Sequence, residues 1–159
     1  MEHLIHEVPA GGGRLALCRM PGRDGDYRAD LNAVLRWAPS MVVSMATETE
    51  MKSHGATNFG SDLAAAGIGW RHLPVDDFEA DSAALRSGWA AVEAVALDLL
   101  RTGQGVLVHC KGGCGRSGMA VMRLMVAAGE PPENALARLR TVRPCAVETD
   151  AQERWAACR

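Results

Sequence analysis

One stretch of the chain limits its possible folds more than any other, because three patterns follow each other there without a break. Residues 105–108 are apolar and β-branched, which predicts a buried strand. Residues 109–118 are rich in glycine, and residues 119–128 carry apolar side chains at helical spacing up to Gly129, a common helix stop. Strand, loop and helix in this order direct backbone N–H groups and a helix N-terminus at one point, an arrangement that binds phosphate.

The side chains of this loop suit the chemistry of a phosphate ester, and we call residues 110–116 the cysteine loop. A helix N-terminus and the neighbouring Arg116 favour the thiolate form of a cysteine, so Cys110 is expected to be a nucleophile. The planar guanidinium of Arg116 can bind two phosphate oxygens. Ser117 can donate a hydrogen bond to the sulfur when it becomes the leaving group. The residues expected to surround a bound phosphate are Lys111, Gly112, Gly113, Cys114, Gly115 and Arg116.

The loop resembles the signature of the cysteine-dependent protein tyrosine phosphatase superfamily, His-Cys-x5-Arg-Ser/Thr, found here from His109 to Ser117. Its Lys-Gly-Gly run and the short chain are most similar to the compact dual-specificity branch, in particular its small bacterial members. The resemblance implies a protein phosphatase that hydrolyses phosphotyrosine, and also phosphoserine or phosphothreonine, through a cysteinyl-phosphate intermediate without metal or cofactor. In that family the histidine before the nucleophile orders the loop, so His109 is expected to have a supporting role.

Two alternative functions stay open. One is a phosphatase for lipid or other non-protein phosphomonoesters, although Lys111 is the only lysine that the loop offers to a strongly anionic headgroup. The other is a non-catalytic phosphate-binding module, which would not need Cys110, Arg116 and an acid together.

A carboxylic acid must protonate the leaving oxygen, and the acidic loop (residues 73–81) after a predicted strand offers several. Residues 72–77, His-Leu-Pro-Val-Asp-Asp, resemble the family pattern His-x-Pro-Ile-x-Asp. The resemblance makes Asp77 the general acid, with Asp76 as the alternative, and makes the same aspartate the base for the water of the second step. Asp81 is instead expected to cap the following helix.

A glutamine near the C-terminus often orients that water in the family. Residues 143–152 resemble this region, which points to Gln152 as a catalytic residue. Thr149 and Gln152 also have the spacing of a capping box, which by itself would explain both residues. Both roles stay open.

Composition narrows the class of protein. The chain has 159 residues, 48% of them hydrophobic, and is expected to form one domain over residues 1–159. A net charge of −2 gives no electrostatic reason to expect nucleic acid or a membrane as a partner, so a phosphorylated protein or peptide is expected, with inorganic phosphate as product. The start lacks the pattern of a signal peptide, and five cysteines without a pairing pattern indicate reduced thiols. A cytoplasmic monomer is therefore expected.

Two further cysteines and a basic cluster need a separate interpretation. Cys114 and Cys145 are expected near Cys110 and could trap it as a disulfide after oxidation, although loop side chains usually point away from a bound phosphate. No second pair of ligands accompanies His109, Cys110 and Cys114, so no metal site is expected. A solvated helix face, rather than a site for acidic substrates, is expected for Arg138, Arg140 and Arg143.

Strands and helices alternate along the chain, which predicts an α/β domain around a mainly parallel sheet of about four to five strands flanked by helices. The resemblance implies the dual-specificity phosphatase fold. Ligands of such sheets bind at the carboxyl ends of the strands, where the cysteine loop falls. The predicted strands are residues 14–18, 41–45, 69–75 and 105–108, and the predicted helices are residues 26–37, 47–53, 61–66 (capped by Ser61), 82–102, 119–128, a helix opened at 131–132, and one from Thr149.

Overall fold

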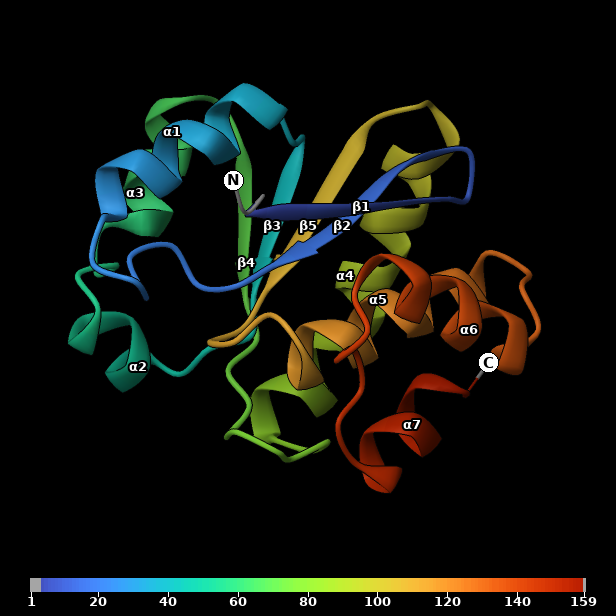
Figure 1. Cartoon of the computed structure of the whole chain (residues 1–159). Coiled ribbons are helices and arrows are strands. Elements are labelled where there is room, and N and C mark those ends of the chain that lie inside the picture. Colours follow the sequence, from blue (N-terminus) through green and yellow to red (C-terminus); the bar gives the residue numbers. More distant parts are fainter. Residues whose placement is uncertain (1–3, 159) are drawn as a thin grey trace.

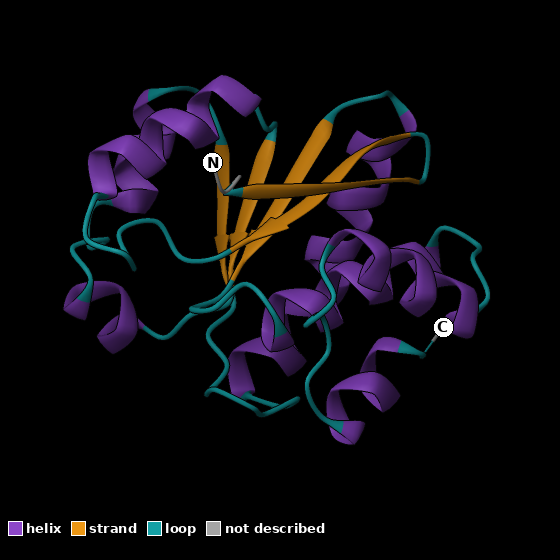
Figure 2. Cartoon of the chain, in the orientation of Figure 1, coloured by secondary structure: helices purple, strands orange, loops and turns teal. Residues whose placement is uncertain are grey.

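The computed structural model describes residues 4–158, and its centre is a five-stranded sheet in the order β1-β2-β5-β3-β4 (Figure 1, Figure 2). β1 is antiparallel to β2, and the other neighbours are parallel. The expected α/β fold with a mainly parallel sheet is confirmed. The strands are β1 (Ile5–Ala10), β2 (Gly13–Cys18), β3 (Met41–Ser44), β4 (Gly69–His72) and β5 (Gly105–His109).

Helices cover both faces of the sheet (Figure 1). They are α1 (Tyr27–Trp37), α2 (Glu48–Ser53), α3 (Phe59–Ala65), α4 (Ala83–Arg101), α5 (Gly115–Ala127), α6 (Pro132–Val142) and α7 (Asp150–Ala156). On one face α1 and α3 pack with Leu107 of β5, and on the other α4 and α5 pack with Val106 and Val108. Strand side chains alternate between faces, so β5 is apolar throughout because both faces are covered. Among the helices of residues 4–158, none is long and apolar enough to cross a membrane.

β5 is the middle strand, and the cysteine loop leaves its carboxyl end. The carboxyl ends of β3 and β4 lie level with that of β5, because Ser44 is in register with both His109 and His72. A further hydrogen bond, from Met45 N–H to His109 O at 2.9 Å, holds the chain after β3 against the same end. The loops that follow these parallel strands therefore meet at one edge of the sheet, as expected.

The N-terminal hairpin is the main difference from the predicted elements. β1 was not predicted, and it pairs with β2 across a turn at Gly11 and Gly12, both with positive φ. Pro9 interrupts the pattern of β1 that would otherwise indicate a strand. β1 lies at the edge of the sheet, where a proline is tolerated because one side of the strand has no partner strand.

Two predicted helix caps are wrong. α3 begins before Ser61, whose hydroxyl donates to Asn58 O from within the helix. Ser82, and not Asp81, caps α4, because its side chain accepts a hydrogen bond from the first turn. Asp81 instead pairs with Arg86 on the surface.

The close packing of α5 on residues 146–147 leaves no room for a side chain at Gly118. A Cβ there would lie 2.6 Å from Val147 N and 3.1 Å from Ala146 Cα. We expect Gly118→Ala to lower the free energy of unfolding by about 1–3 kcal/mol, because the backbone of residues 146–147 has to move. Urea denaturation measures this change.

Gly88→Ala in α4 is the matched control. A Cβ at Gly88 would meet only the flexible end of the Leu73 side chain, at 2.6 Å. Alanine also favours the helical state over glycine by about 1 kcal/mol, so this variant should keep or gain stability. Equal losses in the two variants would contradict the packing argument.

Candidate active site

The thiol of Cys110 lies at the base of the cysteine loop, between the end of β5 and the start of α5. The residue is 2% exposed, and its Sγ is 3.2 Å from Ser117 Oγ in the first turn of α5. The structure thus brings Cys110, the predicted nucleophile, together with the predicted hydroxyl of Ser117. A cavity of about 380 Å³ opens beside them, lined by Arg23, Asp77, Phe78, Cys110, Lys111, Gly112, Cys114, Arg143 and Glu148.

Arg116 is 1% exposed, and the two terminal nitrogens of its guanidinium form hydrogen bonds within the protein. Nη1 and Nη2 donate to the two carboxylate oxygens of Glu50 at 2.7 and 3.0 Å, and Nη1 also donates to Val75 O at 2.8 Å. Nε is buried and has no hydrogen-bond partner among residues 4–158. A buried donor on a charged group is costly to leave unpaired, so Nε is the part of the guanidinium that still needs an acceptor. Arg116 itself is not among the residues that line the cavity.

Sequence patterns did not identify Glu50 as a site residue. Its burial raises its pKa, but the hydrogen bonds from Arg116 and Thr47 lower the pKa by more than burial raises it. The pKa is about 2, so the carboxylate is charged at neutral pH. Burial likewise opposes the charge of Arg116, while the Glu50 carboxylate raises its pKa above the ordinary value. The one sequence signal is the Thr47-x-x-Glu50 capping box, which forms at the start of α2. That local pattern carries no information about a distant arginine.

His109 is fully buried and hydrogen-bonded at both ring nitrogens. Its Nδ1 is 2.9 Å from Cys110 O, and its Nε2 is 2.5 Å from Ser44 Oγ, which accepts from Trp70 Nε1 at 2.8 Å. Trp70 donates to the Ser44 oxygen, so the Ser44 hydroxyl hydrogen can be donated to Nε2. The ring proton is then on Nδ1, which donates to the Cys110 carbonyl. Burial lowers the pKa of His109 to about 4. The neutral ring therefore orients the chain at Cys110, with Ser44 and Trp70 as supports that the sequence did not reveal.

Asp77 is the carboxylate of the acidic loop that reaches the cavity. Its Oδ1 is 3.4 Å from Arg116 Nη2 and accepts from Phe78 N–H at 3.0 Å, and its side chain is 45% exposed. Asp76 and Asp81 do not line the cavity. Phe78 has a left-handed backbone conformation, with φ 67°, and presents an exposed aromatic ring at the cavity.

Gln152 forms the capping box of α7 and does not line the cavity. Its Oε1 accepts from the N–H groups of Glu148 and Thr149 at 2.8 and 3.2 Å. Its Nε2 donates to Glu79 O at 3.3 Å, which connects α7 to the acidic loop. The predicted capping box is therefore present. The catalytic role stays a prediction that would use the second hydrogen of the amide.

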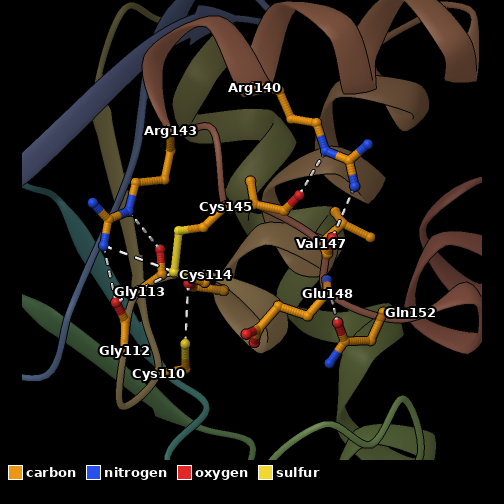
Figure 3. The surroundings of a disulfide bond; sticks show 12 residues. Cys110, Gly112, Gly113, Cys114, Arg140, Arg143, Cys145, Val147, Glu148 and Gln152 are labelled. Atoms are coloured by element: carbon orange, nitrogen blue, oxygen red, sulfur yellow. Dashed lines mark hydrogen bonds between the residues drawn. A yellow bond between two sulfur atoms is a disulfide. The ribbon is translucent and has the colours of Figure 1, made fainter.

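The expectation of five reduced thiols is wrong for two of them, because Cys114 and Cys145 form a disulfide (Figure 3). Neither sulfur is then free to trap Cys110, while Cys18, Cys110 and Cys158 are free thiols. The two cysteines are 31 residues apart in the chain and meet only because the fold places residues 143–149 beside the cysteine loop. The disulfide removes the argument that reduced thiols gave for a cytoplasmic location, which stays a prediction.

All three arginines expected on a solvated helix face donate to backbone carbonyls: Arg138 to Pro9 O, away from the site, and the other two beside the cysteine loop (Figure 3). Arg143 donates from Nε to Gly113 O at 3.1 Å and from Nη2 to Gly112 O at 3.0 Å. Arg140 donates to the carbonyls of residues 146–147 at 2.9 and 2.8 Å. Both therefore hold the chain around the site.

Lys111 and Arg23 add positive charge to the lining of the cavity. Arg23 is exposed, and its nearest carboxylate, that of Asp24, is 3.9 Å away and also binds Arg19. No group of three His, Cys, Asp or Glu side chains in the described part of the chain could hold a metal ion.

Comparison with known families finds one matching model, described as "Polymorphic toxin system, DSP-PTPase phosphatase", over residues 38–130. Among solved structures, Tk-PTP in its active form is 29% identical over 98% of this chain and 95% of its own, with a TM-score of 0.74. A mutant form of Tk-PTP is 30% identical over 91% and 87% of the two chains, with a TM-score of 0.72. No curated protein matches the chain significantly.

Two more distant structures share the fold. Kinase associated phosphatase, with its catalytic cysteine replaced by serine, is 21% identical over 96% of this chain and 90% of its own, with a TM-score of 0.82. PTPMT1 is 22% identical over 90% and 87% of the two chains, with a TM-score of 0.68, and its structure is also known in complex with PI(5)P.

The lowered pKa of His109 has a consequence for acid stability. The unfolded chain binds a proton at the ordinary pKa of 6.5, but the folded chain binds it only near pH 4. The stabilisation is therefore complete above pH 6.5 and is lost as the pH falls from 6.5 towards 4. Between pH 6.5 and 5 the loss should be about 2 kcal/mol.

His109→Gln removes this titration and should lose less stability over the same pH range. The measurement is urea denaturation of both proteins at pH 7.0 and 5.0, compared by midpoint and slope. The same pH loss in the two proteins would contradict the assignment.

Proposed function

Because the chain belongs to the DSP-PTPase phosphatases, we propose that it hydrolyses phosphotyrosine in proteins, and also phosphoserine or phosphothreonine, through a cysteinyl-phosphate intermediate. The observation that carries this proposal is the guanidinium of Arg116. Its Nη2 lies 3.4 Å from Asp77 Oδ1, its buried Nε has no partner among residues 4–158, and Cys110 and Asp77 line the same cavity. One anion bound there would meet the nucleophile on one side and the acid on the other. All these residues come from one chain, so a monomer suffices.

In the first step the Cys110 thiolate attacks phosphorus, and the bond from phosphorus to the ester oxygen breaks. Asp77 gives its proton to the leaving oxygen, as a general acid. Arg116 and the loop N–H groups stabilise the charge on the transferring phosphoryl group. The buried contact with Glu50 keeps the guanidinium in place without using Nε.

In the second step water attacks the cysteinyl-phosphate, and the bond from sulfur to phosphorus breaks. Asp77, now deprotonated, takes a proton from the water. Ser117 Oγ, 3.2 Å from Sγ, donates a hydrogen bond to the sulfur as it leaves. Inorganic phosphate is then released and the thiolate is restored.

Arg143 supports the direction of the loop N–H groups in both steps. A trans peptide points its N–H opposite to its C=O. Because Arg143 holds the carbonyls of Gly112 and Gly113, the N–H groups of Gly113 and Cys114 turn away from Arg143 and are available to an anion.

Phe78 favours an aromatic phosphate ester as substrate. The residue is 58% exposed and lines the cavity next to Asp77, so its ring can pack against the ring of phosphotyrosine. Lys111 and Arg23 in the same lining favour a second candidate, a non-protein phosphomonoester with a further anionic group. The structural neighbour PTPMT1 has been crystallised with PI(5)P, and a comparison of kcat/KM for that lipid and for a phosphotyrosine peptide separates the two candidates.

The mechanism is tested by three variants assayed on a phosphotyrosine peptide with EDTA present. Cys110→Ser should have no turnover above background. Asp77→Asn should lose about 100-fold or more in kcat, because a general acid contributes about that factor, and should also lose the basic limb of its pH–rate profile. Asp76→Asn is the matched control and should keep both its kcat and the basic limb of its pH–rate profile. A larger loss in Asp76→Asn than in Asp77→Asn would move the acid to the neighbouring residue.

Arg143→Ala tests the direction of the loop N–H groups. We expect kcat/KM to fall about 10-fold, less than the roughly 10²–10³-fold cost of deleting an oriented donor outright. Arg140→Ala disturbs the same segment without touching the cysteine loop and should lose far less. Equal losses would mean that the segment as a whole, and not the two loop carbonyls, matters.

A further inference from the structure

The disulfide between Cys114 and Cys145 joins the cysteine loop to residues 143–149 (Figure 3). Cys114 is the last loop residue before α5, and its carbonyl accepts from Val147 N–H at 3.1 Å. Cys145 stands two residues after Arg143, whose side chain holds the same loop at Gly112 and Gly113. The covalent bond therefore fixes both the end of the loop and the backbone that carries Arg143.

The two residues that form this bond are accessible to solvent. Cys145 is exposed and Cys114 is partly exposed, in the lining of the cavity. By contrast Cys18 is buried, and its burial raises the pKa of its thiol far above the ordinary value. A thiol in solution can thus approach the Cys145 side of the disulfide.

Cys114 is suited to be the leaving group of a thiol–disulfide exchange. It precedes the first residue of α5, whose N-terminus favours negative charge, and Arg143 Nη2 lies 3.8 Å from its Sγ. A sulfur that is stabilised as the thiolate leaves faster in such an exchange. The two features favour attack at Cys145 with release of the Cys114 thiolate.

We propose that the Cys114–Cys145 disulfide is a site of reversible reduction by dithiols, and that its reduction weakens oxyanion binding by the cysteine loop. A thiolate of the dithiol attacks Cys145 Sγ, forms a mixed disulfide and releases the Cys114 thiolate. The second thiol of the dithiol then closes its own disulfide and releases Cys145. Two electrons pass from the dithiol to the protein, and its two protons end on the two cysteines or in solution.

Reduction affects binding because the loop has few constraints of its own. Its glycines leave the backbone free to turn, and the inward direction of its N–H groups depends on contacts from residues 143–149. Without the covalent bond, hydrogen bonds and the packing of the buried Ala146 and Val147 hold that segment against the loop, and Met20 N–H holds the loop at Lys111 O from the other side. The kinetic consequence rests on the proposed function, but the binding of inorganic phosphate does not.

The test is a titration with dithiothreitol under nitrogen, with the disulfide content measured by iodoacetamide trapping and mass spectrometry. Binding of inorganic phosphate is measured by calorimetry on the Cys110→Ser variant, which keeps the disulfide and cannot turn over substrate. We expect the affinity to fall about 5-fold or more in step with reduction, the lower end of typical couplings between sites. Reoxidation should restore it.

Matched cysteine variants identify the bond responsible. Cys145→Ser in the Cys110→Ser background should bind phosphate like the reduced protein with and without dithiothreitol. Cys158→Ser in the same background removes an exposed free thiol and should respond like its parent. Circular dichroism before and after reduction of the parent shows whether the fold is kept.

An unchanged or increased affinity after full reduction would overturn the proposal. So would a fall in affinity that also appears on adding dithiothreitol to the Cys145→Ser protein. If the Cys110-competent protein fails to hydrolyse phosphotyrosine while the binding change is seen, the proposed function fails and the redox site stands.

Discussion

The buried charge of Arg116 is the constraint on which the rest of the site depends. A guanidinium cannot be deprotonated in a protein, so its burial needs a counter-charge and hydrogen-bond acceptors. Glu50 of α2 provides the charge, and the carbonyl of Val75 provides a further acceptor. Arg116 itself stands at the start of α5, so one side chain joins the chain segments that follow β3, β4 and β5. Among residues 4–158 these partners leave only Nε of the guanidinium without a hydrogen bond, and Nε is the donor that the proposed anion would pair.

The cysteine loop is shaped from outside by a segment of chain about 30 residues further on. Arg143, the disulfide and the hydrogen bond from Val147 to Cys114 all come from residues 143–149. The approach is so close that a Cβ at Gly115 would overlap the Glu148 side chain. α7 follows this segment and reaches the acidic loop through Gln152. The anion site and the acidic loop are thus supported by the same piece of the chain.

The sequence predicts those parts of the site that are local in the chain. Cys110, Arg116 and Ser117 lie within one strand-loop-helix unit, so their spacing alone places them together, and the sheet that carries them follows from the alternation of strands and helices. Glu50 and Ser44 act on residues about 65 positions away, and their own neighbourhoods show only a capping box and a buried strand. Such partners depend on packing, which no local pattern encodes. β1 was missed for a local reason, since Pro9 conceals the strand pattern.

Because β5 is central in the sheet and β4 is at its edge, the two parts of the site that follow these strands differ in local stability. The strand before the thiol is central, paired on both sides and covered on both faces, whereas the strand before Asp77 is four residues long and lies at the edge. Opening the edge strand breaks one ladder of hydrogen bonds, and opening the central strand breaks two and exposes both cores. Amide exchange should thus be faster in β4, before Asp77, than in β5, before Cys110. Warming should therefore loosen the segment that carries Asp77 before it loosens the cysteine loop.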